Sequence, residues 1–87
     1  MTVYVDVLMN HGWKLRGHPT KNCHMFTDGD IEELHEMAEA IGMKRSWFQD
    51  KRIKHYDLRA SRRQKAIELG AVEVSRREAV KIWRKLK

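Results

Sequence analysis

The sequence contains a single cysteine, Cys23, so no disulfide can form within the chain. It also lacks any apolar run close to the roughly 20 residues that a membrane-spanning helix requires. The opening stretch, MTVYVDVLMNHG, is too short and too polar for a secretory signal peptide. Together these absences predict a cytoplasmic protein with no membrane partner.

Length limits the architecture as strongly as composition does. With 87 residues the chain is long enough for one domain and too short for two, so a single domain over residues 1–87 is expected. A chain of this size buries only a small core. Packing is therefore the simplest interpretation for most large apolar side chains, Trp47 and Trp83 among them.

Strand and helix signals alternate along the chain. β-Branched and aromatic residues mark short strands, whereas apolar residues spaced three and four apart mark helices. Residues 7–21 are irregular and are expected to form a loop or a short hairpin. The expected strands cover residues 2–6, 22–26, 43–48 and 71–74. The expected helices lie between Asp30 and Gly42, over about 59–69 and after Ser75. A polar connection covers residues 49–57.

Capping residues support the expected helices. Asp30 and Ser75 are preferred N-cap residues, and a glutamate three positions after each completes a capping-box pattern. Gly42 and Gly70 suit the position that follows a helix, where the backbone is often left-handed. The alternating order predicts a small two-layer or three-layer α/β domain with a short, mostly parallel sheet and about three helices.

Charge is distributed unevenly along the chain, whose formal net charge is +6. Residues 1–50 carry five Lys/Arg and eight Asp/Glu, a net charge of −3, whereas residues 51–87 carry thirteen Lys/Arg and four Asp/Glu, a net charge of +9. This asymmetry favours a polyanionic partner such as nucleic acid or a nucleotide. The alternative is that the basic residues only form solvated helix faces.

Four arginines stand near the starts of expected helices: Arg62, Arg63, Arg76 and Arg77. The helix dipole disfavours cations at this end. Their presence there favours a bound anion, because backbone amides and guanidinium groups together can hold a phosphate. The sequence has no phosphate-binding glycine loop and no nucleophile-elbow motif, so the ligand class stays broad.

Polar residues follow the expected strands. In open α/β sheets, sites form at the carboxyl ends of the strands. Asp6 and Gln49 stand at such ends and are candidate site residues. Asp6 can bind a metal, act as a base or simply cap a turn in the segment that follows.

Histidines supply further candidates. His24 lies beside Cys23, but the histidine spacing and the lone cysteine do not match a structural zinc motif, so no metal site is predicted. His55, Tyr56 and Asp57 follow a basic stretch, where they can contact phosphate or move a proton. Alternatively, Tyr56 packs in the core and Asp57 caps the next helix.

A compact polar and aromatic group, Asn-His-Gly-Trp, occupies residues 10–13. His11 and Trp13 are candidate ligand-binding residues, because an aromatic side chain in a loop can stack on a base. A small domain also uses tryptophan to close its core, so packing remains the alternative for Trp13.

Seven stretches carry a family resemblance: Val-Tyr-Val-Asp, Asn-His-Gly-Trp, Cys-His-Met-Phe-Thr-Asp, Glu-Glu-Leu-His, Arg-Ser-Trp-Phe-Gln, His-Tyr-Asp-Leu and Leu-Gly-Ala-Val-Glu-Val. Through these stretches, nearly the whole chain resembles an uncharacterised family of small bacterial and phage proteins, which is known only as a domain of unknown function. The resemblance implies a bacterial or phage source, and therefore the host cytoplasm if the protein is phage-encoded. It supports the single domain and implies no activity, cofactor or catalytic residue.

The first functional hypothesis is a non-catalytic binding module for nucleic acid or a nucleotide, which in a phage would be an accessory or host-modulating protein. The paired arginines would hold phosphate, and Trp13 or Tyr56 would stack on a base. Asp6 or Gln49 would contact the polar edge of that base. This function needs no cofactor.

The alternative is a small metal- or His-dependent phosphodiesterase or nuclease. Asp6 and Asp57 would hold a divalent metal ion or position water. His24 or His55 would serve as base or acid. A third hypothesis is a protein that binds and inhibits a host enzyme through its basic helices. The sequence leaves open whether the chain is an enzyme and what its oligomeric state is.

Overall fold

The structure, a computed structural model, describes residues 2–15 and 18–86, and the side chains of residues 10–20 lie outside that description. In chain order the elements are β1 (Val3–Val5), β2 (Met9–Leu15), β3 (His18–Thr27), α1 (Ile31–Ala40), the 3₁₀ helix η1 (Arg45–Trp47), β4 (Tyr56–Arg59), α2 (Ala60–Glu68), β5 (Val72–Glu73) and α3 (Arg76–Lys85). In the described residues, no helix is long and apolar enough to cross a membrane.

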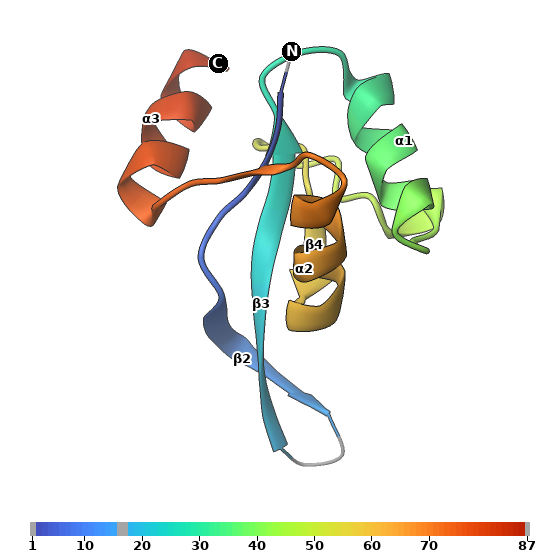
Figure 1. The fold of residues 1–87 in the computed structure, drawn as a ribbon. Helices are drawn as coiled ribbons and strands as arrows, with labels where there is room; N and C mark the ends of the chain where they lie inside the picture. The colour runs from blue at the N-terminus through green and yellow to red at the C-terminus, as the bar shows by residue number, and fades with distance from the viewer. Residues whose placement is uncertain (1, 16–17, 87) are drawn as a thin grey trace.

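The long strand β3 organises the sheet (Figure 1). Strands β2 and β1 pair with successive parts of one edge of β3, and β4 pairs with the other edge. These three pairings are antiparallel, and β5 adds to β1 in parallel. The expected α/β class with three helices is confirmed, but the expectation of a mostly parallel sheet is wrong. Strands β2 and β3 follow one another in the chain and pair with each other, which makes them antiparallel, and β1 and β4 also run antiparallel to β3.

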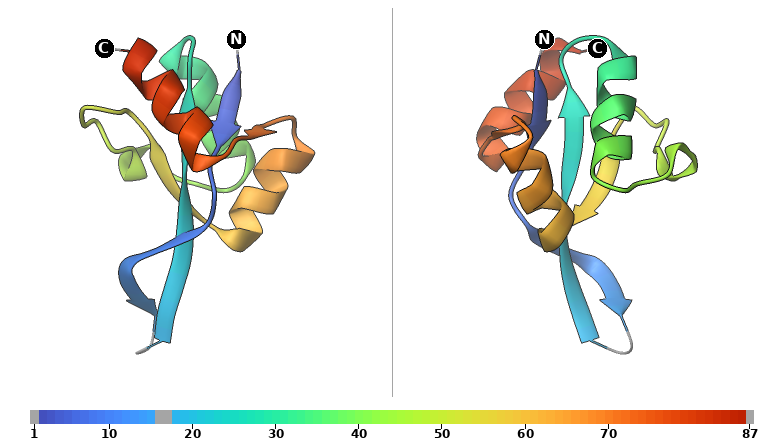
Figure 2. Two further views of the ribbon diagram at one scale, coloured as in Figure 1. Left: turned by 90° about the vertical axis from the view of Figure 1, so that its left-hand side faces the viewer. Right: turned by 45° about the vertical axis from the view of Figure 1, so that its right-hand side comes forward.

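Helices cover both faces of the sheet. Helices α1 and α2 lie on one face and α3 lies on the other, which gives three layers (Figures 1 and 2). The larger core cluster lies between the sheet and helices α1 and α2, and it includes Val5, Leu34 and Leu58. A smaller cluster joins Phe26 to Ala79 and the partly buried Trp83 beneath α3.

Alternation along β3 assigns its side chains to these two layers. Cys23 and Met25 belong to the larger core cluster. Phe26 belongs to the smaller cluster, and the His24 ring contacts Trp83 of α3 with centroids 5.7 Å apart. Successive side chains of a strand point to opposite faces. The same rule directs His24 toward α3 and its neighbour Cys23 away from it.

The helix ends follow the predicted caps. The Asp30 side chain accepts a hydrogen bond from the backbone N–H of Glu32, and Ser75 forms a full capping box with Glu78. Gly42 and Gly70 have φ angles of 86° and 109°, the left-handed conformation that glycine adopts without a steric cost.

Two segments between α1 and α2 differ from the expectation. Residues 43–48 contain the helical turn η1 instead of a strand, and the Arg45 guanidinium of this turn pairs with carboxylates of α1, Glu32 and Glu39. The last two residues of the expected polar connection, Tyr56 and Asp57, instead begin strand β4. Asp57 lies inside that strand, and Arg59, not Asp57, is the N-cap of α2.

Asp28 secures the start of β1 and gives a pH-dependent contribution to stability. Its carboxylate accepts hydrogen bonds from the Thr2 backbone N–H at 3.0 Å and the Tyr4 hydroxyl at 2.9 Å. Mainly because of the Thr2 N–H, the pKa of Asp28 lies below its ordinary value of 3.8. A carboxyl whose pKa falls on folding stabilises the fold above its ordinary pKa, and this contribution is lost as pH drops through the folded-state pKa.

We therefore expect Asp28→Asn to lower the free energy of unfolding at pH 7, and the difference from the wild type to shrink below about pH 4. Urea unfolding of both proteins between pH 7 and pH 2.5, followed by circular dichroism, measures this difference. A difference that stays constant over the whole range would show that the charge of Asp28 is not the cause.

Candidate active site

Three neighbouring strands place Asp6, His24 and Asp57 in one row. His24 of β3 and Asp57 of β4 are directly paired residues. On the other edge of β3, the Asp6 backbone N–H, just after β1, donates to the His24 carbonyl at 3.1 Å. Side chains at such positions share a face of the sheet. The row therefore lies on the face that α3 covers.

Asp6 and His24 form the closest contact of the row. One oxygen of the buried Asp6 carboxylate accepts the His24 backbone N–H at 2.6 Å, and the other lies 2.8 Å from His24 Nδ1. An ionised carboxylate can only accept, so Nδ1 carries the proton that it donates. Asp6 thus fixes the orientation of the ring and directs Nε2 to the opposite side.

His55 is held by a similar arrangement. A backbone bridge to Gln49 fixes the residue, with N–H to carbonyl distances of 2.8 and 3.2 Å. Its Nδ1 lies 2.6 Å from the Ile53 carbonyl oxygen, which can only accept, so this nitrogen also donates. His55 Nε2 is then directed toward Asp57, whose Oδ1 lies 3.5 Å away.

The two imidazoles and Asp57 meet at one point. His24 Nε2 lies 4.0 Å from the same Asp57 Oδ1, and the two imidazole rings meet edge to face with centroids 4.9 Å apart. One side-chain N or O atom from each of the three residues lies within 4.8 Å of the others. Three electron-rich groups at this spacing can share a proton or a cation.

The surroundings of His55 favour a positive charge in the cluster. Burial lowers its pKa, but hydrogen bonding to the Asp57 carboxylate and to the Ile53 carbonyl more than offsets that effect. The pKa of His55 therefore lies above its ordinary value.

Arg63 supports the cluster from α2. Its Nε donates to the Asp6 backbone carbonyl at 2.9 Å, and its Nη1 lies 3.2 Å from a Glu73 carboxylate oxygen. Arg63 thereby ties the end of β1 to β5 and α2. Its role in the described structure is to hold Asp6 in place.

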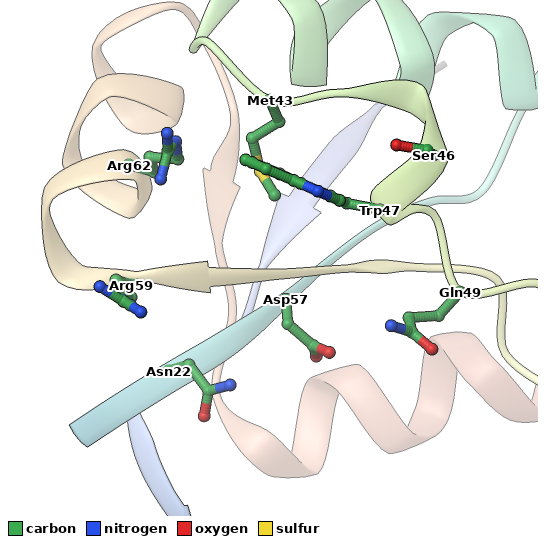
Figure 3. Close-up of a pocket in the computed structure, with 8 residues that line it drawn as sticks. All are labelled: Asn22, Met43, Ser46, Trp47, Gln49, Asp57, Arg59 and Arg62. Carbon is green, nitrogen blue, oxygen red and sulfur yellow. The ribbon is translucent and has the colours of Figure 1, made fainter. Parts of the chain in front are cut away.

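An open pocket of about 460 Å³ lies beside the cluster (Figure 3). Asp57 belongs to the cluster and also lines the pocket. Its carboxylate points to the α3 side of β4, whereas Met43, Trp47 and Arg62 lie on the other side of that strand. The residues that line the pocket are Asn22, Met43, Ser46, Trp47, Gln49, Asp57, Arg59 and Arg62.

The pocket combines an aromatic face, two guanidinium groups and two amides. Trp47 is 43% exposed, and the Arg62 guanidinium lies over its ring, 5.6 Å from the centroid. Asn22 is only 2% exposed, yet its Oδ1 has no hydrogen-bond partner among the described residues. Leaving a buried polar atom unpaired costs free energy, so Asn22 Oδ1 is a ready acceptor for a ligand.

The site residues predicted from the sequence lie in different parts of the structure. Asp6, His24, His55 and Asp57 come together, although they are far apart in the sequence. Gln49 lines the adjacent pocket. Tyr56 is fully buried in the larger core cluster, and its hydroxyl lies 2.6 Å from His35 Nδ1. The side chains of His11 and Trp13 lie outside the described residues.

The four arginines at helix starts have separate surroundings. Arg62 lines the pocket, whereas Arg63 is engaged with Asp6 and Glu73. Arg76 contacts the Met9 sulfur at 3.4 Å, and Arg77 is exposed.

Five pocket residues were not among the sequence candidates: Asn22, Met43, Ser46, Trp47 and Arg59. Trp47 was assigned to the core because residues 43–48 were expected to form a strand. Arg59 offers a signal that could have been used, since a basic residue is a poor N-cap and sits immediately before α2. Asn22 gives no such signal, because its role depends on pairing between strands.

Comparison with known proteins identifies a family and no function. A family model described as "Protein of unknown function (DUF4031)" matches residues 3–86. No curated protein and no solved structure matches the chain.

Cys23 takes no part in this chemistry. It is fully buried on the opposite face of the sheet, and burial raises the pKa of its thiol to about 12.

We expect a thiol reagent such as Ellman's reagent to leave the native protein unmodified at pH 8 and to react with one thiol per chain in guanidinium chloride. Rapid reaction of the native protein would contradict this placement.

Proposed function

The chain belongs to the DUF4031 family of proteins of unknown function, and we propose that it hydrolyses phosphodiester bonds in a nucleotide or nucleic acid. The observation that carries this proposal is the convergence of Asp6, His24, His55 and Asp57 from distant parts of the sequence. Titratable groups gathered in this way beside an open pocket are typical of active sites. A purely structural role needs no such gathering.

The pocket supports a phosphate-containing substrate. Arg59 and Arg62 line it, and guanidinium groups bind phosphate oxygens with paired hydrogen bonds. A phosphate held by these arginines would lie in the same pocket as the Asp57 carboxylate.

The same pocket suits a nucleobase. Trp47 is partly exposed, and a base that displaces Lys44 or Arg62 from the ring could stack on it. Asn22 and Gln49 carry amides at the pocket wall, and amides can pair with the polar edges of bases. The unpaired Asn22 Oδ1 would accept a hydrogen bond from a ring or exocyclic N–H.

The reaction assigned to the cluster is attack of water on phosphorus. The water oxygen forms a bond to phosphorus while the bond between phosphorus and the leaving oxygen breaks. One water proton passes to the cluster and then to the leaving oxygen, so atoms and charge balance. Asp57 is the residue in both the cluster and the pocket, and it would receive or position that water.

Binding without turnover is the second candidate function. The net charge of +9 in residues 51–87 and the two arginines of the pocket favour an anionic ligand whether or not a reaction follows. In this case the cluster would only contact the ligand. Affinity would fall steeply with salt if several phosphates were contacted.

We expect the purified chain, supplied with divalent metal ions, to hydrolyse bis(p-nitrophenyl) phosphate or a short single-stranded oligonucleotide. Asp57→Asn and His55→Gln should each lower kcat by about 100-fold or more, because each removes a group that handles the water or its proton. Asp50→Asn is the matched control, since Asp50 is exposed and its carboxylate pairs with Lys54. Release of p-nitrophenolate or of shortened oligonucleotide measures the rate.

Equal activity in wild type and Asp57→Asn would trace the turnover to a contaminant and refute the proposal. Salt-sensitive binding of the oligonucleotide with no product, at any metal concentration, would replace hydrolysis by the second candidate function.

A further inference from the structure

We propose that His24, His55 and Asp57 form a site for one divalent transition-metal ion of the Zn²⁺ type, with Asp6 as the residue that orients His24. The inference deepens the proposed hydrolysis and rests on it for the ion's catalytic role. Binding of the ion itself can be tested separately.

The spacing of the three ligand atoms fits such an ion. Donors around a tetrahedral zinc lie about 3.3 Å apart, given metal–ligand distances of about 2.0–2.1 Å. Asp57 Oδ1 lies 3.5 Å from His55 Nε2 and 4.0 Å from His24 Nε2. All three ligand atoms lie within 4.8 Å of one another, so side-chain movements of about 1 Å would complete the coordination.

The second nitrogen of each imidazole is engaged as metal-binding histidines require. Histidine ligands nearly always donate their other N–H to a carboxylate or a backbone carbonyl, which fixes the tautomer. His24 Nδ1 lies 2.8 Å from the Asp6 carboxylate, and His55 Nδ1 lies 2.6 Å from the Ile53 carbonyl. Both rings thus present Nε2 to the same point as Asp57. Two independent groups impose this tautomer, which makes a chance arrangement a poor explanation.

The donor set also indicates the class of metal. Two imidazole nitrogens and one carboxylate suit zinc or a neighbouring first-row metal, whereas magnesium and calcium prefer oxygen donors alone. Three protein ligands leave room for water, as in catalytic zinc sites. The two carboxylates Asp6 and Asp57 would balance the charge of a divalent ion.

The ion would supply the water activation that the proposed hydrolysis needs. A water molecule bound to zinc has a pKa near 7, far below that of bulk water, so it becomes a nucleophile at neutral pH. The pocket would hold the phosphate beside it through Arg59 and Arg62. The ion neither changes oxidation state nor is consumed, so the reaction needs water alone as its second reactant.

The test uses the full chain, stripped of metal with a chelator and then titrated with Zn²⁺ by calorimetry or with Co²⁺ by visible absorption. We expect saturation with one ion at the cluster. His55→Gln and Asp57→Asn should weaken binding at this site at least 10-fold, and Asp6→Asn about 10- to 100-fold with the Co²⁺ spectrum retained, because it removes only the orienting group. Asp50→Asn should bind as the wild type does.

NMR of the imidazole nitrogens of the wild type tests the metal site even if a variant fails to fold, because this measurement needs no variant. In the wild type, Zn²⁺ should shift the Nε2 resonances of His24 and His55 and leave that of His35 unchanged. Absence of these shifts, or binding that His55→Gln and Asp57→Asn leave unaltered, would overturn the metal site.

The two proposals can fail separately. One-to-one Zn²⁺ binding at the cluster without any hydrolysis would keep the metal site and refute the proposed reaction. Hydrolysis that persists in the metal-free protein and needs His55 and Asp57 would refute the metal site and leave the proposed reaction to these side chains without a metal ion.

Discussion

The hydrogen-bonded pair of Asp6 and His24 is the constraint on which the site depends. It joins the end of β1 to the middle of β3 through both backbone and side chain, and Arg63 holds the Asp6 carbonyl from α2. Asp6 is only 4% exposed, and a buried carboxylate needs hydrogen-bond partners, of which His24 supplies two. The pair therefore fixes a strand register and an imidazole tautomer at the same time.

The sheet packs the larger core on one face, and on the face toward α3 it carries the cluster beside the smaller core. On β4, the side chains of Tyr56 and Leu58 enter the larger core, while Asp57 between them joins the cluster with His24. On β3, Cys23 and Met25 alternate with His24 in the same way. Because alternation is a geometric property of any strand, the core positions and the site positions cannot exchange without a shift of register.

Local signals predicted the helices well and the sheet less well. Asp30, Ser75, Gly42 and Gly70 act on the turns beside them, so their roles followed from sequence and were confirmed. The η1 turn and the exposed Trp47 were missed, because the local pattern does not show contacts between this segment and α1 such as those of Arg45 with Glu32 and Glu39. The antiparallel pairings were missed for a similar reason, since strand signals do not specify a partner.

The sequence by itself determined the α/β class, the three capped helices, the buried cysteine's lack of a disulfide partner and the basic character of residues 51–87. All of these follow from composition or from neighbours within a few positions. Only the tertiary structure decided that Asp6, His24, His55 and Asp57 meet and that Tyr56 is core. The pairing of β3 with β1 and β4 brings these residues together, because pairing between strands that are distant in the sequence sets which side chains lie next to one another.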